Sequence, residues 1–303
     1  PECHAAYDRA REIFYTHFAH LFAEKGGPIY REEVPYEGGV LPCWRVLPDG
    51  ASKGTILFHG GNDSLLEEFT DALLYLAQGG YTVLAFEGPG QGAALRKSGL
   101  TFTPEWEKPV GAVLDHYGAE DVTIIGVSLG GELCMRAAAM EPRIRRVVSW
   151  SVLPSIYGAL MADKPAEIRA KLEHWLDENN RDAILDLYAG LAEREPLFRW
   201  SIQHSNYAYG TSDVYEYLQK ARAFTIEPVA ERITQDVLLL SAREDLLMDF
   251  GLYKQEIDLL KNTRSLEFVV PGWALNGQAH CNMGNTKYML DLILNWNDRM
   301  LER

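Results

Sequence analysis

Short, uninterrupted apolar runs alternate with longer segments of helical spacing over most of this chain. The runs lie at 55–58, 81–86, 122–127, 146–151, 237–240 and 266–270. An apolar run without polar alternation is typical of a strand that is buried on both faces of a parallel sheet. The helical segments lie at 64–78, 104–117, 129–140, 250–261 and 285–301. Because parallel strands need such crossovers, the alternation predicts an α/β fold with a mostly parallel central sheet flanked by helices.

Two stretches depart from this alternation. Residues 4–24 carry apolar side chains at helical spacing, and two strand-like runs follow at 29–36 and 40–47 around a glycine turn. Residues 154–232 contain no convincing strand but several helical patterns, as expected of an insertion that folds over the carboxyl edge of the sheet. We therefore expect an N-terminal helix and hairpin over 1–50, a core over 51–153 and 233–303, and a helical cap over 154–232.

The composition argues against several classes of protein. The net charge is −14, and such an acidic surface repels nucleic-acid phosphates and anionic lipids, so neither nucleic acid nor membrane is an expected partner. No apolar run approaches the roughly 20 residues that span a bilayer, and the first residues lack the pattern of a signal peptide. The four cysteines have neither metal-binding nor disulfide-framework spacing. We expect a cytoplasmic protein without a metal site.

A serine lies at the turn between one of these strands and the helix that follows it. Gly126 and Gly130 flank Ser128 at two residues on either side, which relieves the crowding of a sharp strand-to-helix turn. The hydroxyl then projects beside the helix N-terminus, whose N–H groups face a developing negative charge. This arrangement is the nucleophile elbow of the α/β-hydrolase fold, and it predicts Ser128 as a nucleophile. The alternative is a glycine-rich turn with an incidental serine.

The loop after the first parallel strand, HGGNDS at 59–64, is a candidate oxyanion loop. In this fold an N–H from that loop joins the N–H of the residue after the nucleophile to hold the oxyanion. Leu129 supplies the first donor, and either Gly61 or Asn62 supplies the second. His59 is expected to brace the loop rather than to act as a base. The same polar residues also suit the N-cap of the helix that follows, and the two interpretations are compatible.

The fold predicts the order serine, acid, histidine along the chain. Asp245 comes just after the run at 237–240, and His280 lies in the loop between the last strand and the last helix. We expect His280 to accept the Ser128 proton while Asp245 holds its other ring nitrogen. Glu244 and Asp249 are the rival acids. An acidic residue that merely forms a turn is the alternative interpretation of this position.

Three motifs together resemble one branch of the α/β-hydrolases: FEGPGQG at 86–92, GGNDS at 60–64 and AHC at 279–281. That branch contains 2,6-dihydroxypseudooxynicotine hydrolase, fungal hydrolases that shorten polyketide chains, and esterases related to the fermentation–respiration switch protein. The resemblance implies the Ser–Asp–His triad assigned above, no cofactor, and cleavage of esters or of carbon–carbon bonds next to ketones. Larger members dimerise through a longer N-terminal domain, so a homodimer is an expectation from the resemblance alone.

Aromatic residues are frequent in the predicted cap. Those within it include Trp175, Tyr188, Phe198, Trp200, Tyr207, Tyr209, Tyr215, Tyr217 and Phe224. Most are expected to be packing residues, but a roof of this composition suits an apolar or aromatic acyl group. The polar run at 203–207 interrupts the apolar pattern. Its residues His204, Asn206 and Tyr207 are therefore candidates to bind a ketone or phenol oxygen of a substrate.

These features predict a serine hydrolase that acts through an acyl-enzyme on a small molecule. The expected substrate is a small to medium apolar or aromatic ester, or a compound with a ketone-activated carbon–carbon bond. One alternative is an amide hydrolase similar to aminopeptidases or acylaminoacyl peptidases. Another is a catalytically silent fold that acts as a binding module.

Overall fold

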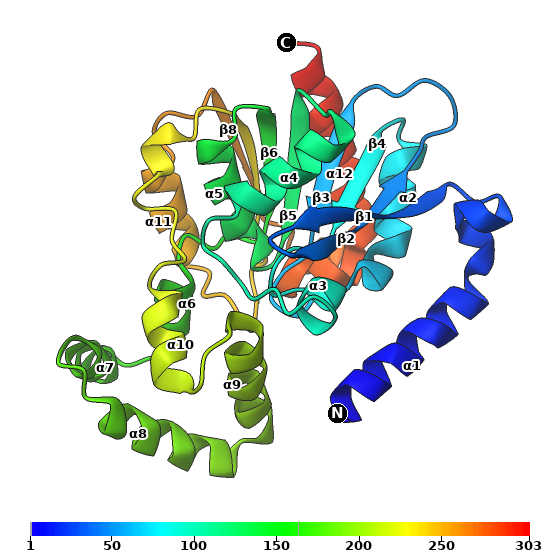
Figure 1. The fold of residues 1–303 in the computed structure, drawn as a ribbon. Helices are drawn as coiled ribbons and strands as arrows, with labels where there is room; N and C mark the ends of the chain where they lie inside the picture. Colours follow the sequence, from blue (N-terminus) through cyan, green and yellow to red (C-terminus); the bar gives the residue numbers. More distant parts are fainter. Residues whose placement is uncertain (1, 163) are drawn as a thin grey trace.

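The computed structural model of the chain describes residues 2–162 and 164–303, and their strands form one twisted sheet (Figure 1). The strands are β1 Ile29–Tyr36, β2 Gly39–Val46, β3 Thr55–His59, β4 Thr82–Phe86, β5 Val122–Val127, β6 Ile144–Trp150, β7 Asp236–Leu240 and β8 Ser265–Val269. Their order in the eight-stranded sheet is β1-β2-β4-β3-β5-β6-β7-β8. Strands β3 to β8 run parallel, and the β1–β2 hairpin joins antiparallel to β4. The predicted α/β fold is confirmed.

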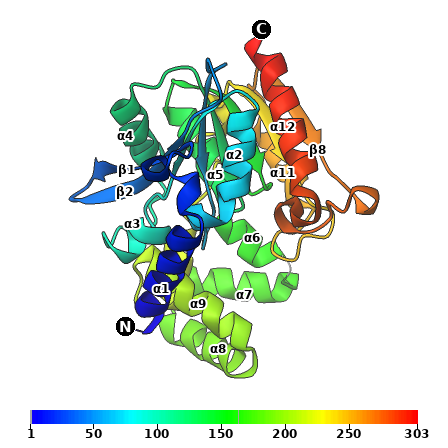
Figure 2. The same ribbon diagram turned by 90° about the vertical axis from the view of Figure 1, so that its right-hand side faces the viewer.

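Helices cover both faces of this sheet (Figure 2). In the sheet domain they are α2 Thr70–Gln78, α3 Gly92–Arg96, α4 Glu107–Tyr117, α5 Gly130–Met140, α11 Leu252–Leu259 and α12 Thr286–Leu301. Alternate residues of β5 face opposite layers, since Ile124 packs with the α4 and α5 side and Ile125 packs with the α2 and α12 side. This double burial explains why the parallel strands are apolar without interruption.

The N-terminal region forms a helix and a hairpin, with a shorter helix than the sequence predicts. Helix α1, Glu2–His17, ends before the predicted 24 because Phe22, beyond two short 3₁₀ turns, packs against Trp44 of the hairpin at a ring-centroid distance of 5.3 Å. In the hairpin turn, Glu37 and Gly38 have φ of 44° and 78°, as in a two-residue turn of the kind that suits twisted strands.

Between β6 and β7 the chain builds a layer of helices at the carboxyl end of the sheet (Figure 1). These are α6 Ile156–Ala162, α7 Ala166–Asp177, α8 Arg181–Arg194, α9 Pro196–Tyr209 and α10 Val214–Ala221. We call them the cap. Local signals set their ends: Asn180 and Asp213 accept N-cap hydrogen bonds, and α9 begins at a proline and ends at Gly210 with φ 65°.

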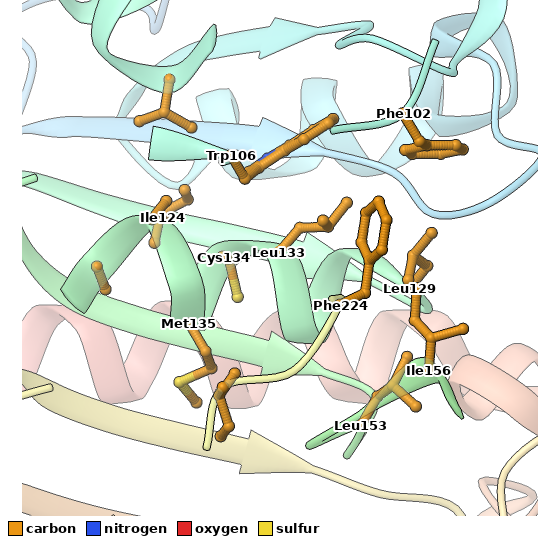
Figure 3. Packing of buried hydrophobic residues seen from close by; sticks show 14 of the residues in the cluster. Phe102, Trp106, Ile124, Leu129, Leu133, Cys134, Met135, Leu153, Ile156 and Phe224 are labelled. Atoms are coloured by element: carbon orange, nitrogen blue, oxygen red, sulfur yellow. The ribbon is translucent and has the colours of Figure 1, made fainter. Parts of the chain in front are cut away.

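The cap and the sheet domain share one hydrophobic core. Phe224, which follows α10, packs in the same cluster as Leu129 and Leu133 at the start of α5 (Figure 3). Leu153 and Ile156, where the chain leaves the sheet for the cap, belong to this cluster as well. The base of the cap is therefore fixed next to the turn that carries Ser128. Within the described part of the chain, no helix is long and apolar enough to cross a membrane.

Candidate active site

Ser128 occupies the turn between β5 and α5 in a left-handed backbone conformation, with φ 60°. A side chain at Gly126 would overlap the carbonyl of Gly130, and one at Gly130 would lie 2.7 Å from the carbonyl oxygen of Gly60. Both glycines are therefore required sterically, as the sequence predicts. The backbone N–H of Ser128 donates to the carbonyl oxygen of Trp150 at 3.1 Å, which ties the turn to the neighbouring strand.

The structure brings together the serine, histidine and aspartate that the sequence singles out. Ser128 Oγ lies 2.9 Å from His280 Nε2, and His280 Nδ1 lies 2.7 Å from Asp245 Oδ2. The second carboxylate oxygen of Asp245 accepts the backbone N–H groups of Leu247 and Met248, at 2.8 and 3.1 Å. The three contacts to Asp245 fix the carboxylate, and His280 Nε2 faces the serine.

The rival acids point elsewhere. Glu244 Oε1 accepts the indole N–H of Trp273 at 2.6 Å, and Asp249 Oδ1 accepts the backbone N–H of Gly251 at 2.7 Å. Neither carboxylate contacts His280. Asp245 is therefore the acid that the geometry favours.

The protonation of His280 is governed by two opposing effects. Burial, the largest single effect, disfavours the charged imidazolium, but the hydrogen bonds and charges of Asp245 and Cys281 together outweigh it. The result is a pKa for His280 raised above the usual 6.5. With Nδ1–H donating to the Asp245 carboxylate, the neutral ring presents an acceptor at Nε2 to the Ser128 hydroxyl.

The loop of His280 is anchored by Asn282, a residue to which the sequence gave no role. Its side-chain Nδ2 donates to the carbonyl oxygens of Gly277 at 2.6 Å and Ser241 at 3.1 Å, and its Oδ1 accepts the indole N–H of Trp150 at 3.1 Å. Asn282 has φ 55° and is 1% exposed. Asparagine tolerates this conformation better than most residues, which is the signal that the sequence contained.

The candidate oxyanion loop lies directly against Ser128. A Cβ on Gly61 would come within 2.7 Å of Ser128 Cβ and 3.0 Å of the Leu129 nitrogen, so only glycine fits. The Gly61 N–H donates to Ser64 Oγ at 2.8 Å, whereas the N–H groups of Asn62 and Leu129 have no hydrogen-bond partner among the described residues. The alternative N-cap role is not observed, since the helical segment begins with a short 3₁₀ turn at Leu66 and Ser64 bonds within the loop.

His59 braces this loop, as the sequence predicts. Its Nδ1 lies 3.1 Å from the Gly60 carbonyl oxygen, and its Nε2 accepts the indole N–H of Trp106 at 3.3 Å. Complete burial lowers the pKa of His59 to about 4, so the ring is neutral at physiological pH. Both ring nitrogens are occupied, which leaves His59 no part in proton transfer at Ser128.

A cavity of about 500 Å³ opens over Ser128 and His280. Its walls come from both the sheet domain and the cap, and they are largely apolar. The apolar lining includes Val127, Leu153, Ile156, Leu160, Leu197, Trp200, Met248 and Met283. Four hydroxyl-bearing residues of the cap, Ser201, Ser205, Tyr209 and Tyr217, also line the cavity. The cavity thus suits an apolar group with few polar atoms.

The residues proposed from the sequence as substrate contacts lie outside this cavity. His204 Nε2 lies 3.2 Å from the Asn62 carbonyl oxygen, Asn206 bonds to Thr211, and the Tyr207 hydroxyl lies 3.0 Å from His4 Nε2. Asn206 lies on the opposite side of helix α9 from the cavity-lining Leu197 and Ser201. His204 lies on the cavity side of the helix, where its ring stacks on Trp200 at a centroid distance of 5.3 Å.

No group of three or more His, Cys, Asp or Glu side chains in residues 2–162 and 164–303 is arranged to hold a metal ion.

The chain belongs to the α/β-hydrolase fold family, whose profile matches residues 56–274. Among its curated relatives, alpha/beta hydrolase psoB of Aspergillus fumigatus is 32% identical over 217 residues, which are 64% of this chain and 48% of the relative. Hydrolyase ccsE of Aspergillus clavatus is 30% identical over 293 residues, which cover 85% of this chain and 65% of the relative. The chain thus spans between about half and just under two thirds of these relatives.

Solved structures give the same assignment of fold. A 2,6-dihydroxy-pseudo-oxynicotine hydrolase superposes with a TM-score of 0.67 at 20% identity, over 90% of this chain and 68% of that one. The Pyrococcus furiosus esterase Pf2001 superposes with a TM-score of 0.57 at 17% identity, over 90% of this chain and 93% of that one. These matches show the fold, and together with the fungal relatives they confirm that the chain belongs to the α/β-hydrolases that the sequence motifs resemble.

Proposed function

We propose that this chain is a serine hydrolase that acts through an acyl-enzyme, with Ser128 as nucleophile, His280 as general base and Asp245 as the acid that orients the histidine. The observation that carries the proposal is the continuous hydrogen-bonded series from Asp245 through His280 to Ser128 on the floor of the cavity. Neither rival acid takes part in this series.

In the proposed reaction, Ser128 Oγ bonds to the substrate carbonyl carbon while its proton passes to His280 Nε2. The negative charge that develops on the carbonyl oxygen is held by the N–H groups of Leu129 and Asn62, because the Gly61 N–H is already bound to Ser64. Collapse of the tetrahedral adduct breaks the bond to the leaving group, which takes the proton from His280.

Water then attacks the acyl-enzyme. His280 accepts a proton from the water, the acid product leaves, and Ser128 recovers its proton. For an ester the leaving group is an alcohol. For a ketone-activated carbon–carbon bond it is a carbanion that the adjacent ketone stabilises as an enolate, so the same residues serve both reactions.

The substrate class follows from the walls of the cavity. A volume of about 500 Å³ with mostly apolar lining accommodates a small to medium apolar or aromatic acyl group. Ser201 and Ser205 are the small polar side chains of the cap that line this cavity. Both the ester and the carbon–carbon reaction stay within this proposal.

A second candidate is an amide hydrolase that recognises a substrate amine. Two acidic residues, Asp63 and Glu68, border the cavity beside the oxyanion loop, and burial together with the charge of Asp63 raises the pKa of Glu68. Such a pair attracts a cationic group. Cleavage of aminoacyl p-nitroanilides in preference to p-nitrophenyl esters would favour this candidate, and the reverse preference would favour the first.

The first experiment is labelling with a fluorophosphonate probe followed by peptide mass spectrometry. We expect one adduct, on Ser128, that is lost in Ser128→Ala and His280→Ala but kept in His174→Ala, a control at an exposed cap histidine. An adduct then justifies a screen of aryl esters and β-diketones. If the folded protein gives no adduct, the proposed mechanism is wrong and the binding-module interpretation takes its place.

A further inference from the structure

We infer that Gln91 is a positioning residue that holds the Gly61–Asn62 peptide so that its N–H faces the oxyanion at Ser128. The inference rests on the proposed function, because an oxyanion forms only if Ser128 is acylated. Gln91 lies between β4 and α3, within the FEGPGQG motif. Nothing in the mechanism above uses this motif.

The amide of Gln91 is fully occupied by the backbone around the oxyanion loop. Its Nε2 donates to the carbonyl oxygens of Gly60 at 2.8 Å and Gly61 at 2.9 Å. Its Oε1 accepts the N–H of Gly88 at 2.9 Å. The NH₂ group can donate to the two carbonyls, and the oxygen can accept from the N–H. With the amide reversed neither match would hold, so these partners fix its orientation. The side chain is 1% exposed, so water does not compete for these bonds.

The planarity of the peptide bond passes this constraint on to the oxyanion donor. In a trans peptide, the carbonyl of Gly61 and the N–H of Asn62 point in opposite directions. Gly61 O is bound to Gln91, so the Asn62 N–H points away from Gln91. Asn62 borders the cavity together with Ser128 and Leu129. Gln91 thereby holds the carbonyl of the peptide bond whose N–H, on Asn62, is the second oxyanion donor.

The FEGPGQG motif is shaped to bring Gln91 to this position. A Cβ on Gly88 would overlap the ring of Trp106, and one on Gly90, whose φ is 88°, would overlap Phe102. Glu87 accepts the backbone N–H groups of Leu66 at 3.1 Å and Ala93 at 2.6 Å, which ties the motif to the segment after the oxyanion loop. The glycines and Glu87 thus form a rigid support for the Gln91 amide.

The test replaces the amide but keeps the shape of the side chain. Gln91→Met removes both donors, and we expect kcat on an aryl ester to fall about 10- to 100-fold, somewhat less than the loss of a direct oxyanion donor, with KM within about threefold. The rate of fluorophosphonate labelling should fall in proportion. Gln91→Glu keeps the shape but sets a carboxylate against two carbonyl oxygens, so we expect a loss at least as large.

Gln235→Met is the matched control. Gln235 Nε2 also donates to a backbone carbonyl, that of Ala138 at 2.7 Å, but near the far end of α5 from Ser128. We expect unchanged kcat in this variant. If folded Gln91→Met retains kcat within twofold of the parent, or loses activity only through KM, the inference is overturned. The proposed function then stands, because Ser128 is still labelled.

A measurement on the unaltered chain covers the case in which the Gln91 variants fail to fold. In ¹H–¹⁵N spectra of the fluorophosphonate adduct, the amide protons of Asn62 and Leu129 should shift downfield as they bind the phosphonyl oxygen. The Gly61 amide proton, bound to Ser64, should stay in place. A shift of Gly61 without a shift of Asn62 would overturn the inference. Absence of any adduct at Ser128 would instead overturn the proposed function.

Discussion

Ser128 holds a backbone conformation that side-chain-bearing residues seldom adopt, with φ 60°. Such strain persists only where the surroundings over-determine the backbone, and here two glycines and a hydrogen bond to Trp150 do so. The conformation directs the hydroxyl to His280, and Leu129 lines the cavity with its N–H unbonded among the described residues. At this scale the site depends on a few rigid backbone positions.

Replacing the hydroxyl of Ser128 tests its role most directly. We expect Ser128→Ala to lower kcat on any ester that the parent cleaves by at least about 10⁴-fold, since the covalent route is removed. The unfolding temperature should change little, because the backbone turn keeps its supports. Steady-state kinetics and thermal unfolding on the same preparations check both statements. Parent-like turnover in the variant would contradict the mechanism.

The raised pKa of His280 predicts an alkaline pH profile. Only the neutral ring accepts the serine proton, and a pKa above 6.5 means that the neutral form accumulates only at higher pH. The rise of kcat/KM with pH should therefore have its midpoint above 6.5.

The Asp245→Asn variant tests how the carboxylate affects the protonation of His280. The carboxylate favours the imidazolium, so its loss should move the midpoint of the pH profile downward while kcat falls by up to about 10⁴-fold. A matched Asp249→Asn change, at the rival acid that bonds Gly251, should move neither quantity. A midpoint that stays fixed in Asp245→Asn would show that another group controls the profile.

At the scale of elements, the strands were the most predictable part of the fold. A strand buried on both faces must be apolar throughout, so the runs at 55–58 and 122–127 marked β3 and β5 nearly to the residue. The end of helix α1 was less predictable, because it depends on the packing of Phe22 against Trp44, which lies farther along the chain. The short helix α3 was not predicted, since its start lies in a glycine-rich motif that favours a turn.

The residues of the candidate site that could be predicted are those whose position follows from the neighbouring strands and helices. Ser128, Asp245 and His280 follow from their places between strands and helices, and the structure joins them. Gln91 and Asn282 were not predictable in their roles, because each bonds to backbone carbonyls far along the chain. The cavity-facing side of α9 was also not predictable, because the rotation of a cap helix depends on its packing against the sheet domain.

The oxyanion loop gives a sharp prediction at this scale. In Gly61→Ala the new methyl group would lie 2.7 Å from Ser128 Cβ, so the loop must move away from the serine. We expect a fall in kcat of about 10²- to 10³-fold, comparable with the loss of one oxyanion donor. Gly190→Ala is the control, since no atom lies within 4 Å of its added Cβ in α8. Equal activity in the two variants would contradict the assigned geometry.

The whole molecule is united by a core that runs without a break from the sheet into the cap. Because Phe224 packs with Leu129 and Leu133, the cap has no separate interior at its base. We expect cap and sheet to unfold together, so that tryptophan fluorescence and far-ultraviolet circular dichroism report the same midpoint. Phe224→Ala should lower the free energy of unfolding by about 3–5 kcal/mol in one transition. Two separate transitions would contradict this expectation.

The hairpin at one margin of the sheet has a consequence for solubility. In the described sheet β2 is the only strand that pairs with β1, and a single bridge from Phe22 to Ile29 covers the start of its outer edge, so the backbone groups farther along that edge are open to pairing with a strand of another molecule. The strand carries Arg31, Glu32 and Glu33 in succession, and Pro35 lacks an N–H to donate. Charge and the missing donor discourage edge-to-edge growth, so the strand that completes the sheet also protects the chain against aggregation.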